Sequence, residues 1–162
     1  IYTLSLHDAL PILINVGKIK FAPGTIASLI TCFLFLLSIN IFDILILFFC
    51  TIVIFCYSFV AINSSLHSFD TNDPHEIVID EVVGQMLPLL AIPIYETLYL
   101  VPKEYYCVVA FVLFRLFDIW KPFPISYIDN NTKGVLGIML DDVLAGIYTF
   151  IVLTLMFFFL GA

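Results

Sequence analysis

Long apolar runs constrain the fold of this chain more than any other feature of its sequence. Five of them follow one another and predict five helices, at Ile26–Phe42, Ile44–Ile62, Val82–Leu100, Tyr105–Ile119 and Val143–Leu160. A helix needs about 20 apolar residues to cross a bilayer, with a range of about 17–25, and the first, second and fifth runs reach this length. The third run contains two prolines and a glutamate, and the fourth is short, so these two predict spanning helices less strongly.

The composition agrees with a membrane protein. Hydrophobic residues make up 62% of the 162 residues and charged residues 12%, and the mean hydropathy is +1.13, whereas a soluble domain has about 25% charged residues. The net charge of -7 excludes a nucleic-acid-binding role, which needs a basic surface. The four cysteines lie in apolar runs without CxxC spacing, so we interpret them as small hydrophobic residues. The predicted fold class is an all-α, polytopic helical membrane protein.

The length is that of a single domain. Residues 13–162 are expected to form one helical membrane domain. Residues 1–12, "IYTLSLHDALPI", lack the basic start and the apolar core of a signal peptide. We expect them to be a non-native or unstructured extension.

The polar stretches between the apolar runs predict the orientation in the membrane. If all five runs cross, the three longer polar stretches, at residues 15–25, 63–81 and 120–142, emerge on one side. Four lysines lie on that side, and only Lys103 lies on the other. The positive-inside rule therefore predicts that the three stretches face the cytoplasm.

Two pairs of adjacent acids fall on this predicted cytoplasmic side. Asp80 and Glu81 are expected to begin the third helix, and Asp141 and Asp142 to begin the fifth. Carboxylate oxygens suit Mg²⁺, and a bound cation relieves the repulsion between crowded acids. Acids at a helix N-terminus also complement the helix dipole without binding a ligand, and that alternative stays open.

Three further charges end the fourth predicted helix. Arg115 and Lys121 are natural partners for a phosphate group, and Asp118 is a candidate metal ligand or water-orienting base. Arg115 and Asp118 also share a helix face at a spacing of three residues and could form a structural pair. Lys121 could instead extend to the membrane interface.

The stretch "FAPGTIASL", residues 21–29, leads into the first predicted helix. Thr25 is a plausible N-cap, and Gly24 permits a close approach of the backbone. Free backbone N–H groups at such a helix start favour an anionic ligand. Ordinary helix capping explains the same residues equally well.

Four ordered stretches of the sequence resemble one enzyme family. They are "APGTIASL", "DPHEIVIDEVVGQ", "FRLFDIWKPFPI" and "GVLGIMLDDVLAG". In their order and spacing, from about residue 17 to the end, they resemble the phosphatidylglycerophosphatase A family. This resemblance implies a magnesium-dependent bacterial membrane enzyme that hydrolyses phosphatidylglycerophosphate to phosphatidylglycerol and inorganic phosphate.

The resemblance also implies the site residues. The catalytic candidates are Asp80, Glu81, Asp118, Asp141 and Asp142. The metal candidates are the two acid pairs, Asp80, Glu81, Asp141 and Asp142. The substrate-binding candidates are Gly24, Thr25, Ser28, Arg115 and Lys121. We expect this site at the cytoplasmic face of the bacterial inner membrane, with the tails of the phospholipid substrate in the bilayer.

Two other functions fit parts of the pattern. A small transporter could use membrane charges as a relay, but such charges usually lie near the midplane, often with repeated or broken helices. A CDP-alcohol phosphatidyltransferase would need a DGxxAR…GxxxDxxxD arrangement, which this sequence lacks.

Overall fold

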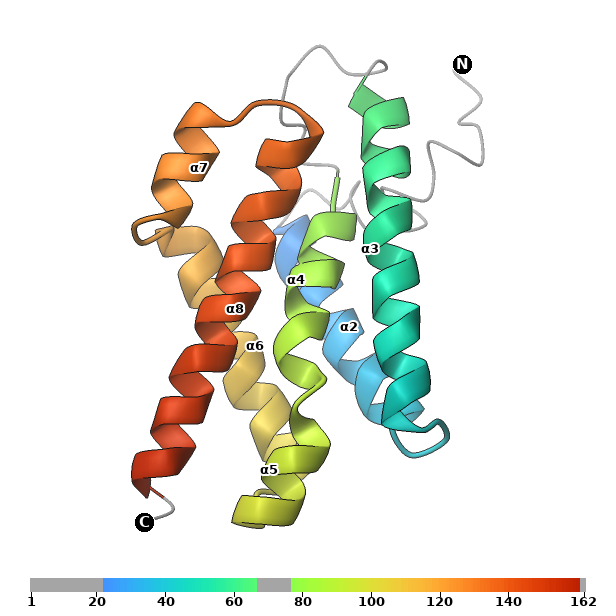
Figure 1. The fold of residues 1–162 in the computed structure, drawn as a ribbon, viewed down its shortest axis with the longest axis vertical. Coiled ribbons are helices and arrows are strands. Elements are labelled where there is room, and N and C mark those ends of the chain that lie inside the picture. The colour runs from blue at the N-terminus through green and yellow to red at the C-terminus, as the bar shows by residue number, and fades with distance from the viewer. Residues whose placement is uncertain (1–21, 67–76, 161–162) are drawn as a thin grey trace.

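Every regular element in the described part of the chain is an α-helix. The computed structural model describes residues 22–66 and 77–160 (Figure 1). The helices in chain order are α2 (Pro23–Ser38), α3 (Ile44–Leu66), α4 (Ile79–Leu89), α5 (Ile92–Tyr99), α6 (Lys103–Trp120), α7 (Ile125–Asn131) and α8 (Val135–Leu160). The predicted all-α fold is confirmed. Residues 1–12 lie outside the described residues, so the expected division of the chain after residue 12 stays a prediction.

Three helical stretches are long and apolar enough to cross a membrane. They are α3 over Ile44–Ser64, α4 and α5 together over Ile79–Tyr99, and α8 over Val135–Phe159. The first predicted helix, Ile26–Phe42, is shifted toward the N-terminus, because α2 begins at Pro23 and ends at Ser38, and with 16 residues it is not among these three stretches. Large apolar side chains such as Phe33 and Phe49 are exposed on the outside of the bundle. A surface of this kind suits contact with lipid, and the predicted membrane character is confirmed.

The third predicted helix is broken into two. The chain leaves the helix at Leu90 and Ala91, between α4 and α5. Pro88 lies inside α4, and Pro93 lies in the first turn of α5. Because Pro93 has no N–H, it cannot donate to the carbonyl four residues earlier, and the helix is interrupted there.

The last helix begins earlier than the sequence predicted. α8 starts at Val135 rather than Val143, so Asp141 and Asp142 lie within it and do not begin it. Gly134, with φ of 73°, precedes the helix in a left-handed conformation that glycine adopts without strain. The expected loop before these acids also contains the short helix α7.

The start of α2 also differs from the prediction. The N-cap is Ala22, and Pro23 occupies the first turn, where proline is favoured because its missing N–H has no helical partner. Thr25 therefore lies inside the first turn and is not the N-cap. Gly24 is buried in the same turn.

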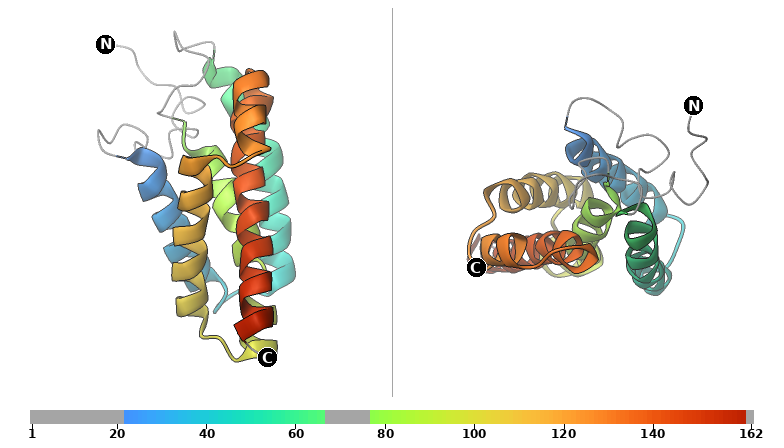
Figure 2. Two further views of the ribbon diagram at one scale, coloured as in Figure 1. Left: turned by 90° about the vertical axis from the view of Figure 1, so that its left-hand side faces the viewer. Right: turned by 90° about the horizontal axis from the view of Figure 1, so that it is seen from above.

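α4 is the central helix of the bundle. It contacts α2, α3, α6 and α8 (Figures 1 and 2). Its closest approach is to α8, where a Cβ atom added at Gly146 would collide with the carbonyl oxygen of Gly84. A Cβ atom at Gly84 would in turn lie 2.6 Å from the carbonyl oxygen of Asp142. This direct backbone contact brings Asp142 beside the first turns of α4.

Replacing Gly146 with leucine tests this contact. The larger side chain must push α8 away from α4, and overpacking of this kind typically costs about 1–3 kcal/mol. We expect Gly146→Leu to lower the thermal unfolding midpoint in detergent, followed by circular dichroism. Phe150→Leu, at a partly exposed position one turn further along α8, is the control and should change the midpoint little. An unchanged midpoint in Gly146→Leu would contradict the close packing.

Candidate active site

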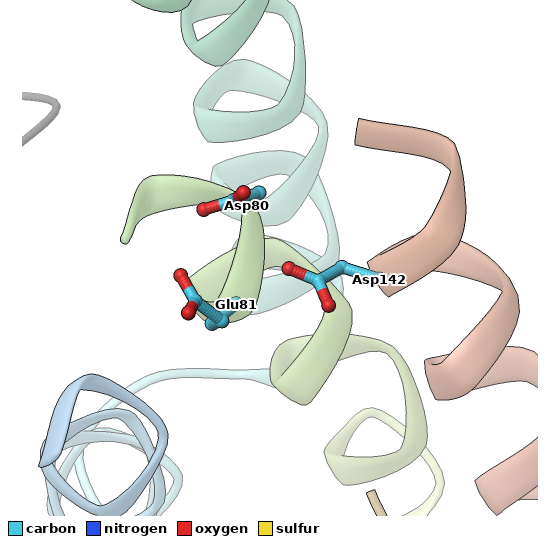
Figure 3. Close-up of side chains that lie close together, drawn as sticks. All are labelled: Asp80, Glu81 and Asp142. Carbon is cyan, nitrogen blue, oxygen red and sulfur yellow. The ribbon is translucent and has the colours of Figure 1, made fainter. Parts of the chain in front are cut away.

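Three carboxylates from two helices converge at one end of the bundle (Figure 3). Asp80 and Glu81 come from the first turn of α4, and Asp142 comes from α8. One oxygen atom of each residue lies within 4.8 Å of the corresponding atoms of the other two. Asp80 is only 8% exposed and Asp142 only 3%. We call these three residues the acid trio.

The acid trio lacks the partners that buried charges require. Asp80 Oδ1, Glu81 Oε2 and Asp142 Oδ1 are buried and have no hydrogen-bond partner among the described residues. Burial of unpaired charges is costly, and like charges at this distance repel one another. A hard divalent cation with oxygen ligands would satisfy both requirements. The donor set therefore fits such a cation.

Gly24 lets α2 approach the acid trio closely. A Cβ atom at this position would collide with Oε1 of Glu81 and would lie 3.2 Å from Nη1 of Arg115. The predicted close approach of the backbone at Gly24 is therefore present. Ser28 is buried one turn further along, but its hydroxyl donates to the carbonyl of Gly24 at 2.9 Å. Ser28 and Thr25 do not line the cavity described below.

Arg115 and Asp118 form an ion pair on α6. Arg115 Nη1 lies 2.6 Å from Asp118 Oδ2, at the spacing of three residues that the sequence predicted. The structural pairing is thus present, but it does not occupy all the hydrogen-bond donors of the guanidinium group. Arg115 Nε and Nη1 have no well-aligned hydrogen bond among the described residues. Arg115 still offers donors to a ligand.

Lys121 bridges two carboxylates from different helices. It follows α6 in a left-handed conformation, and its backbone N–H donates to Phe117 O at 2.8 Å. Its Nζ donates to Asp129 Oδ1 of α7 at 2.6 Å and to Asp141 Oδ2 of α8 at 2.7 Å. Partial burial alone would lower the pKa of Lys121, but the two hydrogen bonds outweigh it and raise the pKa above its ordinary value. Lys121 stays a cation at physiological pH.

All seven predicted charged site residues line one cavity of about 280 Å³. The remaining lining residues are Ala22, Pro23, Gly24 and Ile77. Five carboxylates face two cations in this lining, which leaves a formal charge of -3. Asp141 belongs to the cavity but pairs with Lys121, whereas Asp80, Glu81 and Asp142 make up the acid trio. The expected set of four metal ligands is thus divided into a trio and a salt-bridged fourth acid.

The structure adds two polar residues that the sequence did not single out. Asp129 holds Lys121 from α7, a helix in a stretch that was expected to be a loop. Gln85 is fully buried one turn after Glu81, and both polar atoms of its amide lack partners among the described residues. A polar residue inside an apolar run was the available signal for Gln85. No spacing pattern linked Asp129 to Lys121.

Comparison with known proteins identifies the family. The model of the family described as phosphatidylglycerophosphatase A matches residues 9–157 of this chain. The chain belongs to the phosphatidylglycerophosphatase A family. This family assignment, together with the apolar helices, makes it a membrane-associated lipid phosphatase.

Two relatives carry the name of this family, and a third is named for a different lipid phosphate. A Haemophilus influenzae phosphatidylglycerophosphatase A is 37% identical over 136 residues, which cover 84% of this chain and 79% of the relative. A Bacteroides thetaiotaomicron protein, named as a candidate phosphatidylinositol-3-phosphatase, is 36% identical over 151 residues, 89% of this chain and 91% of the relative. The Escherichia coli phosphatidylglycerophosphatase A is 34% identical over 93 residues, 57% of this chain and 49% of the relative. No solved structure matches the chain.

Gly24→Ala tests the approach of α2 to the acid trio. The added methyl group must displace the carboxylate of Glu81, so we expect lipid phosphatase activity to fall about 10-fold or more while the helix content is retained. The measurement is phosphate release together with circular dichroism. Ala27→Gly, on the same helix but outside the cavity lining, is the control for altered helix propensity. Full activity in Gly24→Ala would contradict the contact.

Asp129→Asn tests the bridge at Lys121. The variant removes one of two charged acceptors of a partly exposed ion pair, so the effect should be modest, at about 1 kcal/mol or less. We expect the KM for a lipid phosphate to rise about threefold with a smaller change in kcat, and Asp129→Glu to restore part of the loss. Equal loss in both variants would indicate that Asp129 has only a role in packing.

Proposed function

We propose that this protein is a magnesium-dependent phosphatase that hydrolyses phosphatidylglycerophosphate to phosphatidylglycerol and inorganic phosphate. One observation carries the proposal. The acid trio, which has buried oxygens without a hydrogen-bond partner among the described residues, shares a cavity with two basic side chains suited to phosphate. The family assignment gives this cavity its chemistry, because the family's name specifies a lipid phosphate ester.

Asp80, Glu81 and Asp142 would hold the magnesium ion. Their unpartnered oxygens support this role, and Mg²⁺ is commonly held by one or two carboxylates together with a substrate phosphate. A bound magnesium ion would supply Lewis-acid polarisation of the phosphoryl group. Asp141 would stay with Lys121 at the side of the cavity.

Arg115 and Lys121 would bind the phosphoryl oxygens. The ammonium group of Lys121 has three donors, and Asp129 and Asp141 occupy two of them. The third donor remains for a phosphate oxygen, while the two carboxylates fix the position of the nitrogen. Arg115 would add the free donors of its guanidinium group, which suit the planar edge of a phosphate.

Asp118 would orient the attacking water. It lines the cavity and is itself held by Arg115. Phosphoryl transfer depends mainly on positioning and on neutralising charge, with the attacking and leaving oxygens in line. Water would attack the phosphorus atom, the bond between phosphorus and the lipid oxygen would break, and that oxygen would take up the proton that the water gives up, which leaves a lipid hydroxyl and inorganic phosphate. Gly24, with Thr25 and Ser28 behind it, would hold the start of α2 against this centre.

The cavity would face the cytoplasm from the inner membrane of a bacterium. Of the described lysines, Lys121 and Lys133 flank α7 near the acid trio, whereas Lys103 begins α6 at the opposite end. This distribution supports a cytoplasmic position for the site under the positive-inside rule. A transport role is less suited to these charges, because they gather at one end of the bundle and the family acts as a phosphatase.

A second candidate substrate is phosphatidylinositol 3-phosphate. The Bacteroides relative, which covers most of this chain, is named for that lipid. Both candidates are phosphate monoesters on a lipid headgroup, so the same cavity could act on either. They differ in the headgroup that must fit beside the phosphate.

Phosphate release from defined lipids tests the proposal. We expect the protein in detergent to release phosphate from phosphatidylglycerophosphate with magnesium, and to lose this activity with a chelator. Asp80→Asn and Asp142→Asn should each lower turnover at least about 100-fold, beyond the 10- to 100-fold typical for loss of an outer-shell partner of a metal. Glu104→Gln, an exposed acid at the other end of α6, is the control.

The outcomes separate the claims. Full activity in Asp80→Asn and Asp142→Asn would overturn the metal role of the acid trio. Faster release from phosphatidylinositol 3-phosphate than from phosphatidylglycerophosphate would replace the proposed substrate.

A further inference from the structure

A large apolar cavity lies beside the one that holds the acid trio. It has a volume of about 450 Å³, is bounded by α2, α3 and α4, and is open along one side. Its walls are apolar side chains such as Leu34, Phe35 and Ile54. Figure 1 shows α2 and α3 joined by a turn at one end of the bundle, and the cavity extends to this turn at Phe42. We call it the α2–α3 groove.

The groove has no charged side chain in its lining, and its hydroxyl groups already donate hydrogen bonds within α2. Thr31 and Ser38 are its two hydroxyl residues. Thr31 donates to Ala27 O at 2.8 Å, and Ser38 donates to Leu34 O at 2.7 Å. An occupant would therefore need no hydrogen-bonding atoms in this region. A water-filled groove would be unfavourable for the same reason.

The groove begins next to the cavity of about 280 Å³ that contains the acid trio, which we call the acid cavity. Val82 lines the groove and follows Glu81 of the acid trio in α4. On α2, Gly24 lines the acid cavity, and the groove starts at Ile30. Six residues of helix correspond to about 9 Å along its axis. The groove then continues along α2 as far as Ser38, toward the opposite end of the bundle.

We infer that the α2–α3 groove holds one acyl chain of the phospholipid substrate while its phosphate lies at the acid trio. This inference rests on the proposed function. At about 30 Å³ for each water-sized group, the groove has room for on the order of 15 such groups. Methylene groups are of similar size, so much of one acyl chain fits. The lengthwise course of the groove also suits a chain that descends from a headgroup at the acid cavity.

A second apolar cavity provides a comparison. It lies between α3, α4 and α8, has a smaller volume of about 270 Å³, and includes Ile52 and Val143 in its lining. Figure 2 shows α2 starting lower than the ends of α3 and α8 that lie at the same side of the bundle. α4 and α6 reach about the same height as α2 in this view, and of the two apolar cavities only the α2–α3 groove is lined by α2. A lipid that reaches the acid trio across α2 enters the α2–α3 groove.

The groove would orient the substrate more than it would tighten binding. Lipid tails are as apolar as the groove, so a chain that moves from the bilayer into it gains little hydrophobic free energy. A chain held in one place, however, fixes the position of the headgroup, and small displacements of a reacting group reduce rates strongly. The effect should therefore depend on chain length.

Photo-crosslinking locates the chain directly. The probe is a non-hydrolysable phosphonate analogue of phosphatidylglycerophosphate with a diazirine midway along one acyl chain, in vesicles of phosphatidylglycerol. We expect cross-links at Leu34, Cys50 or Met86 that excess unlabelled phosphonate analogue removes. Removable cross-links at Ile52 or Ile147, or none in either cavity, would overturn the inference.

A pair of matched variants on α3 tests the consequence for catalysis. Cys50→Trp fills the α2–α3 groove, and Ile52→Trp, two residues away, fills the other cavity. We expect Cys50→Trp to lower kcat/KM about tenfold for a substrate with long chains and to leave a dihexanoyl substrate unchanged, because short chains do not reach Cys50. Ile52→Trp should affect neither substrate.

The two proposals fail in different ways. If the wild-type protein releases phosphate from both substrates but Cys50→Trp and Ile52→Trp behave alike, the groove has no such role and the proposed function stands. If Cys50→Trp loses activity equally on both substrates, the inference is also wrong. If the wild-type protein releases phosphate from neither lipid, the proposed function fails. The cross-linking pattern alone then decides whether the groove binds an acyl chain.

Discussion

Repulsion between three carboxylates, two of them buried and one half-buried, is the constraint on which the rest of this structure depends. Asp80, Glu81 and Asp142 lie within a few ångströms of one another, and their buried oxygens lack partners among the described residues. The direct backbone contact between α4 and α8 at Gly84 and Gly146 brings them together. Helix packing thus holds charges close that would otherwise separate. A cation that joins them would relieve the repulsion and strengthen the same contact.

The basic side chains of the cavity are arranged differently from the acids. Arg115 pairs with Asp118, and Lys121 is held between Asp129 and Asp141. Each cation is therefore fixed before a ligand arrives, and each keeps donors available. Groups that are already oriented need not rearrange during the reaction, and this kind of preorganisation is a major source of catalytic rate. The cavity combines a centre that attracts a cation with a rim that attracts a phosphate.

The sequence predicted the helical fold because apolar runs are a strong signal over long segments. It also predicted that charges far apart in the chain would meet, since the alternation of spans puts them on one side. It was wrong about where the last helix begins, because Val135–Leu140 continues the apolar pattern ahead of Asp141 and the break at Gly134 was interpreted as part of a loop.

The finer features of the site depend on tertiary contacts that leave little trace in one sequence. The bridge from Lys121 to Asp129 exists because the turn after α6 carries α7 back toward the cavity. The separation of Asp141 from the acid trio depends on the rotation of α8 about its axis, which adjacent acids in a sequence do not reveal. The sequence could predict that the backbone approaches another group closely at Gly24, but it could not predict that this group is the Glu81 side chain.

Binding of Mn²⁺, followed by electron paramagnetic resonance, tests the central claim most directly, because it reports on the cation without requiring turnover. Carboxylate sites for magnesium generally accept manganese. The account predicts that the wild-type protein in detergent immobilises Mn²⁺, that magnesium displaces it, and that Asp142→Asn abolishes the bound signal while Asp43→Asn, in the turn between α2 and α3, retains it. Mn²⁺ bound equally well by Asp142→Asn and the wild-type protein would contradict a cation site shared by α4 and α8.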